Sequence, residues 1–137
     1  MTKILSALLA ASLLAATPVR AELIDIDNTR LRELLASGVP IVDIRTEPEW
    51  KQTGVVPGSH RLTFFDEQGR YDARVWVDSF SKIAKPGDPV IIICRTGNRT
   101  GTVGRFLDQQ VKYAKVYNVR EGIVAWMKAG NATEKVN

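Results

Sequence analysis

A run of four β-branched residues, Val90 to Ile93, is the feature of this sequence that most restricts its fold. Such residues favour strands, and a run without polar alternation is typical of a strand that is buried on both faces, as in the centre of a parallel sheet. Neighbouring parallel strands need long crossover connections, which are usually helical. The run therefore predicts a chain in which strands and helices alternate, and it leads directly into Cys94.

The rest of the chain has the expected alternation of short apolar runs and helical patterns. Leu31, Leu34 and Leu35 fall on one helical face, with Asn28 as the expected cap and Gly38 as the stop. We expect strands at 22–27, 40–44, 60–64, 90–93 and 116–119. We expect helices that begin at 28, at 47, at 72, about five residues after Cys94, and near 123; the second is a single turn over 47–50, and the last has its apolar face at 123–127. Trp76, Phe80 and Ile83 are the expected buried face of the helix that begins at 72. Trp50, Trp76 and Trp126 are expected in the core, and residues 130–137 as a frayed polar tail. This order predicts an α/β fold with helices on both faces of a parallel sheet.

The first residues, Met1 to Ala21, have the pattern of a secretory signal peptide. Lys3 is followed by an uncharged run of 13 residues, Ile4 to Ala16, and Val19-Arg20-Ala21 places small residues where a signal peptidase cleaves. The run is shorter than the roughly 20 residues that a membrane-spanning helix needs. We therefore expect export to the periplasm, no membrane anchor after cleavage, and a single domain over residues 22–137 with its core at about 24–129.

Composition and the single cysteine exclude several classes of protein. The 45% of apolar and 25% of charged residues are ordinary for a globular domain. The net charge of +4 is spread along the chain rather than gathered in basic runs, so we expect no nucleic-acid partner. One cysteine forms neither an intramolecular disulfide nor a four-cysteine metal site. We expect no metal and no cofactor, and a monomer by default.

Cys94 follows the buried strand and precedes a helix, and ligands of open α/β sheets bind at this kind of junction. Backbone N–H groups of the loop from Arg95 to Thr100 can surround the sulfur, and Gly97 permits the turn. The helix N-terminus, Arg95 and Arg99 all favour the thiolate. The sequence thus predicts an anion-binding loop with a nucleophile at its floor. The alternative is a buried, inert cysteine at a strand end.

The loop from Cys94 to Thr100 closely resembles the active-site loop of single-domain rhodanese sulfurtransferases. Three further segments resemble that family in order and spacing: Ile41 to Arg45 with Glu49-Trp50, Gly54 to Ser59, and Val116 to Trp126. Two positions depart from the family pattern, since Val55 replaces a common His and Glu121 replaces the first of two Gly. Both are expected away from the loop. The segment from Phe64 to Val77 is longer than in the smallest members and is a candidate wall of the site.

The resemblance implies a three-layer, rhodanese-like fold with a central parallel sheet flanked by helices. It also implies that the Cys94 thiolate takes the outer sulfur of thiosulfate or a similar small anionic donor and carries it as a persulfide to a thiol or cyanide acceptor. The substrate-binding residues that it implies are Arg95, Thr96, Gly97, Asn98, Arg99 and Thr100. Among these, we expect Arg95 to hold the donor's sulfonate and Arg99 to pin the loop through carbonyls or an acid such as Asp43.

The sequence is also compatible with two other functions. One is a non-catalytic rhodanese module that recognises a partner, an anion or a persulfide. The other is a cysteine-dependent phosphatase or arsenate reductase, which is disfavoured because phosphatase loops place arginine at the position of Thr100, one residue after Arg99. His60 is expected to be a structural or surface residue rather than a catalytic base. Asp43 is expected to be a structural partner of an arginine.

Overall fold

The computed structural model describes Ala15 and residues 22–137, so the predicted signal peptide lies outside the described residues except for Ala15. The described chain forms one sheet of five parallel strands in the order β1-β5-β4-β2-β3. The strands are β1 (Glu22–Ile26), β2 (Ile41–Asp43), β3 (His60–Arg61), β4 (Pro89–Ile93) and β5 (Lys115–Val119). The helices are α1 (Asn28–Ala36), α2 (Glu47–Thr53), α3 (Ala73–Phe80), α4 (Asn98–Gln109) and α5 (Gly122–Lys128).

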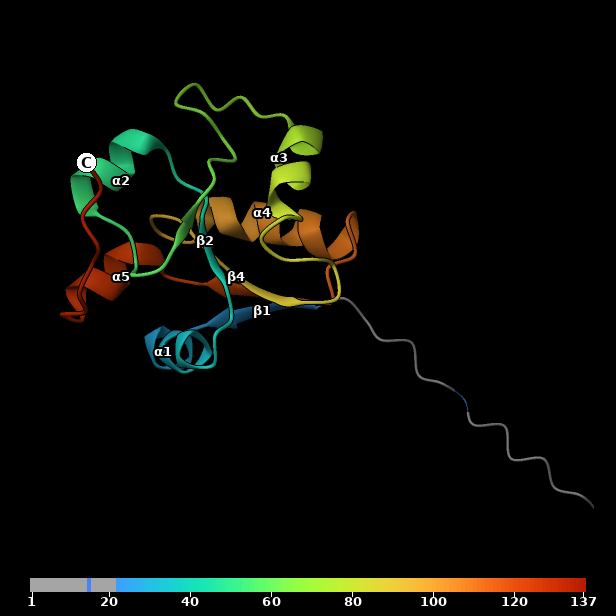
Figure 1. Cartoon of the computed structure of the whole chain (residues 1–137), viewed down its shortest axis with the longest axis horizontal. Coiled ribbons are helices and arrows are strands. Elements are labelled where there is room, and N and C mark those ends of the chain that lie inside the picture. The colour runs from blue at the N-terminus through green and yellow to red at the C-terminus, as the bar shows by residue number, and fades with distance from the viewer. Residues whose placement is uncertain (1–14, 16–21) are drawn as a thin grey trace, which may run out of the picture.

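Helices cover both faces of this sheet, which confirms the predicted three-layer α/β architecture. Figure 1 shows α1 and α5 on one side of the sheet and α3 and α4 on the other. The alternation along β4 explains the two layers, because Ile91 and Ile93 pack with residues of α1 and α5, whereas Val90 and Ile92 pack with residues of α3 and α4. Burial of both side-chain sets supplies most of the hydrophobic stabilisation of such a fold.

Strand β4 is the centre of the sheet, as its composition predicts. It pairs with β2 on one side and β5 on the other, and Val90 to Ile93 are fully buried. The three tryptophans, Trp50, Trp76 and Trp126, are also buried, so their predicted core positions are confirmed. Because the strands are parallel, their carboxyl ends share one edge of the sheet. Cys94 lies at that edge, directly after β4.

Two predicted helix ends differ from the structure by one residue. Asp27, rather than Asn28, caps α1, because its carboxylate accepts a hydrogen bond from the Arg30 backbone N at 2.8 Å. Helix α4 begins at Asn98, four residues after Cys94, because Gly97 takes a left-handed conformation and directs the chain into the helix at once. The loop around the cysteine is therefore tighter than expected.

The C-terminal residues pack against the domain, so the prediction of a frayed tail over 130–137 is wrong. Glu134 exchanges two backbone hydrogen bonds with Val55, at 2.9 and 2.7 Å. Val136 is buried in a small cluster with Trp50 and Val55. The tail follows Gly54 so closely that a Cβ there would lie 2.6 Å from the Glu134 carbonyl oxygen. The apolar side chain of Val136 thus packs beside α2 and anchors an otherwise polar segment.

The described residues contain neither a membrane-spanning helix nor a metal-binding cluster. No helix among them has the length and apolar character needed to cross a membrane. No group of three or more His, Cys, Asp or Glu side chains in the described part of the chain is arranged to hold a metal ion.

Candidate active site

Cys94 lies beneath a short loop that connects β4 to α4, and its side chain is fully buried. The backbone N–H of Gly97 donates a hydrogen bond to Sγ over 3.2 Å. The hydroxyl of Thr100, in the first turn of α4, lies 3.3 Å from Sγ. The sulfur is therefore held between a loop amide and the beginning of a helix, where the N–H dipoles favour negative charge.

The Thr100 hydroxyl is placed to respond to the charge of the sulfur. It donates to the Gly97 carbonyl oxygen over 3.2 Å and, from the same position, reaches Sγ. With a neutral thiol, the S–H group can donate to Oγ1 while the hydroxyl donates to the carbonyl. With a thiolate, the single hydroxyl proton can turn to Sγ instead, since a thiolate only accepts hydrogen bonds. A rotation about one bond thus gives the anion a second donor.

The remaining predicted residues of the loop lie on its outer side. Arg95, Thr96 and Asn98 are exposed, and Gly97 is half-buried. Within residues 22–137, no carboxylate pairs with Arg95. Arg95 is therefore a free cation at the mouth of the loop.

Helix α5 supports the loop from below through its first residues. The backbone N–H groups of Ile123 and Val124 donate to the carbonyl oxygens of Cys94 and Arg95, at 2.9 and 3.2 Å. Gly122, with φ +68°, lies so close that a Cβ would be 2.2 Å from the Arg95 carbonyl oxygen. The segment that carries Glu121 therefore packs on the loop, which corrects the expectation that this departure from the family pattern lies away from it.

Gly97 is also required, because the chain after β5 packs directly against it. Its φ is +94°, a conformation that other residues rarely adopt. A Cβ built on it would lie 1.8 Å from the carbonyl oxygen of Arg120. Both the turn and the close approach of the chain after β5 thus depend on this glycine.

Arg99 is bound by Glu49 of α2 rather than by Asp43, so that part of the prediction is wrong. Its guanidinium donates to both carboxylate oxygens, at 2.8 and 2.6 Å. Glu49 also accepts hydrogen bonds from the backbone N and the hydroxyl of Thr46. The hydrogen bond from Arg99 is the largest cause that lowers the pKa of Glu49 to about 2, and the same bond raises the pKa of Arg99. The predicted role of Arg99 as the residue that pins the loop is consistent with this pair.

Asp43 is unable to reach Arg99 in this way because it is already bound by Arg45. The two side chains form a buried ion pair at 2.8 Å, and Arg45 also donates to the Gly54 carbonyl oxygen at 3.0 Å. This arrangement confirms the expected structural role of Asp43. His60 lies on the edge strand β3, is exposed, and is not among the hydrogen-bond partners of the sulfur, so the structure does not form a Cys–His pair.

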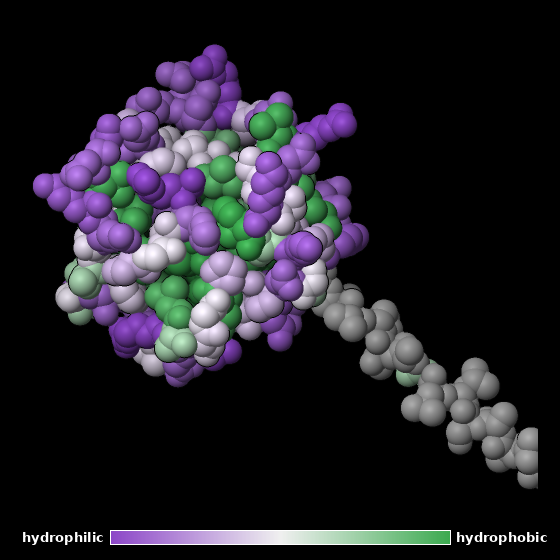
Figure 2. All heavy atoms as spheres, viewed as in Figure 1, coloured by the Kyte–Doolittle hydropathy of each residue, from purple (hydrophilic) through white to green (hydrophobic). Residues whose placement is uncertain are grey.

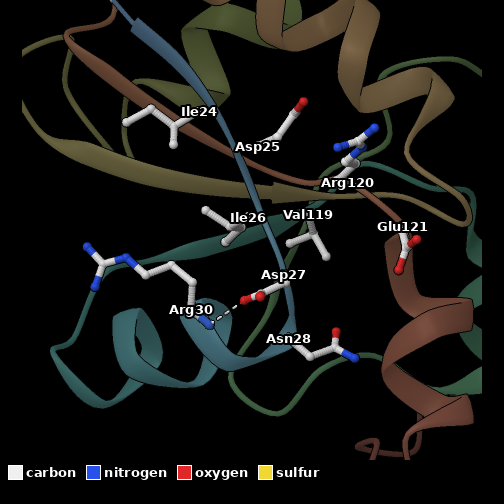
Figure 3. A pocket seen from close by; sticks show the side chains of 9 residues that line it. All are labelled: Ile24, Asp25, Ile26, Asp27, Asn28, Arg30, Val119, Arg120 and Glu121. Atoms are coloured by element: carbon white, nitrogen blue, oxygen red, sulfur yellow. Dashed lines mark hydrogen bonds between the residues drawn. The ribbon is translucent and has the colours of Figure 1, made fainter.

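Several hollows lie near the carboxyl edge of the sheet. Figure 3 shows one of them, of about 490 Å³, at the ends of β1 and β5; the described residues of the loop from Cys94 to Thr100 do not line it. Another, of about 460 Å³, lies between the segment after β3 and the first turn of α4. It is lined by Phe65, Asp66, Glu67, Gly69, Asn98, Arg99 and Thr102. The segment from Phe64 to Val77 therefore does contribute a wall beside the loop.

Comparison with known proteins agrees with this geometry. Residues 27–129 match the family model described as the rhodanese-like domain. A protein of Allochromatium vinosum named sulfurtransferase is 36% identical over 108 residues, which are 77% of this chain and 90% of the relative. Thiosulfate sulfurtransferase 18 of Arabidopsis thaliana is 27% identical over 111 residues, 77% of this chain and 79% of the relative. The solution structure of a polysulfide-sulfur transferase homodimer from Wolinella succinogenes has the same fold, with a TM-score of 0.64, 18% identity, and coverage of 87% of this chain and 83% of that one.

Proposed function

This chain belongs to the rhodanese-like domain family and is a sulfurtransferase, and on that premise we propose that it moves a sulfane sulfur through a persulfide on Cys94. The donor is thiosulfate or a similar small anion, and the acceptor is a thiol or cyanide. The enzyme works without a metal or a cofactor and as a monomer. One observation carries the proposal, which is the placement of Sγ under the Gly97 N–H and the Thr100 hydroxyl.

Two displacements at sulfur make up the reaction. In the first, the Cys94 thiolate attacks the outer sulfur of thiosulfate, a new S–S bond forms, and sulfite leaves with the electron pair of the bond that breaks. In the second, the acceptor attacks the outer sulfur of the persulfide, and Cys94 leaves as a thiolate. The loop amide and the helix N-terminus stabilise the negative sulfur at both ends of the cycle.

The position of Arg99 supports a sulfurtransferase over a phosphatase. A phosphatase loop needs an arginine that holds the oxygens of a tetrahedral phosphate. The guanidinium of Arg99 instead donates to both oxygens of Glu49. The loop around Cys94 is thus closed by an internal ion pair, and Arg99 is not free to hold the oxygens of a phosphate group.

Mass spectrometry of the intact protein tests the proposal. After incubation with thiosulfate and removal of small molecules, the protein is expected to gain the mass of one sulfur atom, and cyanide or a thiol is expected to remove it. The Cys94→Ser variant is the control and should gain nothing. A wild-type protein that binds thiosulfate without any gain in mass would instead support the non-catalytic module.

We also propose that the protein works in the periplasm, because residues 1–21 have the pattern of a cleaved signal peptide. Fractionation of the producing cells and sequencing of the mature N-terminus test this. Glu22 is the expected first residue of the periplasmic form. Recovery of the full-length chain from the cytoplasm would overturn the export proposal and leave the chemistry at Cys94 untouched.

A further inference from the structure

The hollow between the segment after β3 and the first turn of α4 is not lined by Arg95, the residue expected to hold the donor. In Figure 1 the connection from β3 to α3 rises away from the sheet before it returns to α3, and Figure 2 shows polar residues at its outer end. One wall of the hollow is formed by Asn98 and Arg99, the residues of the Cys94 loop that open α4. A molecule bound there would contact Asn98 and Arg99, at the end of the loop that surrounds Cys94.

The charges around this hollow leave one carboxylate free. Arg99 is neutralised by Glu49, and Asp66 pairs with Arg70 at 2.9 Å while accepting two backbone hydrogen bonds of its own loop. Glu67 is exposed and, within residues 22–137, has neither an ion-pair nor a hydrogen-bond partner among the side chains. The hollow therefore has a negative rim, in contrast to the positive Arg95 at the mouth of the loop.

An aromatic side chain forms the apolar part of the same hollow. Phe65 is half-buried and is held in place by two neighbours, with its ring centroid 4.8 Å from that of Phe64 and 5.3 Å from that of Tyr71, both in edge arrangements. Such packing fixes the orientation of the ring. The wall thus combines a fixed apolar surface with a carboxylate two residues further along the chain.

We propose that this hollow binds the sulfur acceptor, and that the acceptor is an aminothiol, a thiol joined to a protonated amine by a short apolar chain. The amine pairs with Glu67, the carbon chain lies on Phe65, and the thiol faces the Cys94 loop over Asn98. This inference rests on the proposed function, because it concerns the second half of that reaction. The acceptor's thiolate attacks the outer persulfide sulfur and its proton goes to solvent. The acceptor leaves as a persulfide and Cys94 leaves as a thiolate.

The assignment separates the two substrates by charge. The donor is a dianion and is drawn to Arg95, whereas an amine is repelled there and attracted by Glu67. The hollow, of about 460 Å³, is shallow and open to solvent, so a small thiol would enter it without a change in the fold. Donor and acceptor would therefore approach the same sulfur from differently charged sides.

Single-turnover transfer from the loaded protein tests the inference. Protein that has gained one sulfur from thiosulfate is mixed with one of three small thiols. The second functional group is a positive amine in cysteamine, a neutral hydroxyl in 2-mercaptoethanol and a negative carboxylate in 3-mercaptopropionate. The loss of the extra sulfur is followed by mass. The ratio of the cysteamine rate to the 2-mercaptoethanol rate should fall about fivefold in Glu67→Gln, the effect of one ion pair at about 4 Å in water. Comparing each variant with the wild type cancels the intrinsic reactivity of the thiols.

Matched variants separate this effect from a general one. Glu22→Gln removes an exposed carboxylate at the amino end of β1, the opposite edge of the sheet, and should leave the ratio unchanged. Glu67→Lys should invert the preference towards 3-mercaptopropionate. Loading by thiosulfate should be the same in all three variants, and their circular dichroism should match the wild type.

The outcomes distinguish the inference from its premise. If the protein loads sulfur and Glu67→Gln and Glu67→Lys leave every thiol ratio as it was, the acceptor does not use this hollow and the inference is overturned, while the proposed function stands. If Cys94 gains no sulfur at all, the proposed function fails and the inference fails with it.

Discussion

Glu49 accepts two hydrogen bonds from the guanidinium of Arg99, at 2.6 and 2.8 Å, and so joins α2 to the loop that holds Cys94. The carboxylate is itself oriented by Thr46, which donates from its backbone N and its hydroxyl at the start of α2. Bidentate pairs of this kind fix geometry as well as charge. Since Arg99 follows Asn98 in the first turn of α4, the pair holds the position at which the loop becomes a helix.

Replacing Glu49 with Gln is expected to slow the loading of Cys94 by thiosulfate about tenfold or more. The substitution removes a charge-assisted interaction, for which the net stabilisation is about 1.5–3 kcal/mol, and leaves Arg99 free to move with the loop. Single-turnover loading followed by mass measures the effect. Glu47→Gln is the matched control, because Glu47 lies in the same helix but pairs with the exposed Lys51. Equal rates in the two variants would contradict a role for the Glu49–Arg99 pair in positioning the loop.

The same pair predicts a dependence of stability on pH. The pKa of Glu49 is lowered from its usual 4.5 to about 2, chiefly by the hydrogen bond from Arg99. A lowered folded-state pKa means that the contribution to stability is fully present above about pH 4.5 and is lost as the pH falls towards 2. In urea unfolding at several pH values, the free energies of unfolding of the wild type and Glu49→Gln should converge as the pH falls through that interval. A difference that stays constant from pH 7 to 2 would refute it.

Gly97 and Gly38 provide a comparison of two glycines in similar backbone conformations. Both have positive φ, +94° and +81°, but a Cβ on Gly38 meets nothing within 4 Å, whereas one on Gly97 would lie 1.8 Å from the Arg120 carbonyl oxygen. Gly38→Ala should therefore cost about 1 kcal/mol of unfolding free energy. Gly97→Ala must also displace the chain after β5, so it should be several-fold more destabilising and should abolish loading. Thermal unfolding and mass measurements on both variants check this, and similar costs would show that the loop adapts.

Much of the fold follows from local pattern in the sequence. The buried run in β4 identifies a central parallel strand, and Cys94 with Gly97 identifies the junction where the chemistry is placed. Such features can be predicted locally, because the residue types themselves indicate a strand that is buried on both faces and a glycine in the left-handed conformation.

The errors concern contacts between residues that are far apart in the chain. Asp43 ends β2, Glu49 lies in α2 shortly after it, and both carboxylates suit an arginine. Only the tertiary structure shows that Arg45 pairs with Asp43 and Arg99 with Glu49. Val136 is one apolar residue in a polar tail, and no periodicity indicates that a gap beside Trp50 receives it. Such long-range pairings depend on the assembled sheet, so the segment alone is insufficient to predict them.

The packed tail makes a prediction of its own. Val136→Ala removes the side chain that fills the gap beside Trp50 and Val55, which should cost about 1–2 kcal/mol and lower the melting temperature by several degrees. Val124→Ala is the control, because Val124 lies in α5 and is 40% exposed. Scanning calorimetry of the two variants gives the comparison. If Val136→Ala has the same melting temperature as the wild type, the Val136 side chain contributes nothing to stability.

Arg95 is expected to act on the donor in the first half-reaction and not on the acceptor in the second. It is exposed, lies directly after Cys94, and has no ion-pair partner within residues 22–137. Arg95→Ala removes a charge-assisted hydrogen bond to the sulfonate, with a net stabilisation of about 1.5–3 kcal/mol. At about 1.4 kcal/mol per tenfold, kcat/KM for thiosulfate should fall roughly ten- to a hundredfold.

The second half-reaction should be nearly unaffected by Arg95→Ala, because the sulfonate has already left as sulfite when the acceptor arrives. Measuring loading by thiosulfate and discharge to cyanide separately therefore distinguishes two roles for this arginine. Lys115→Ala, which removes an exposed cation at the amino end of β5, controls for the overall charge of the protein. An equal slowing of both half-reactions would mean that Arg95 positions the loop. Unchanged rates in both would mean that the site was built for a donor without a sulfonate.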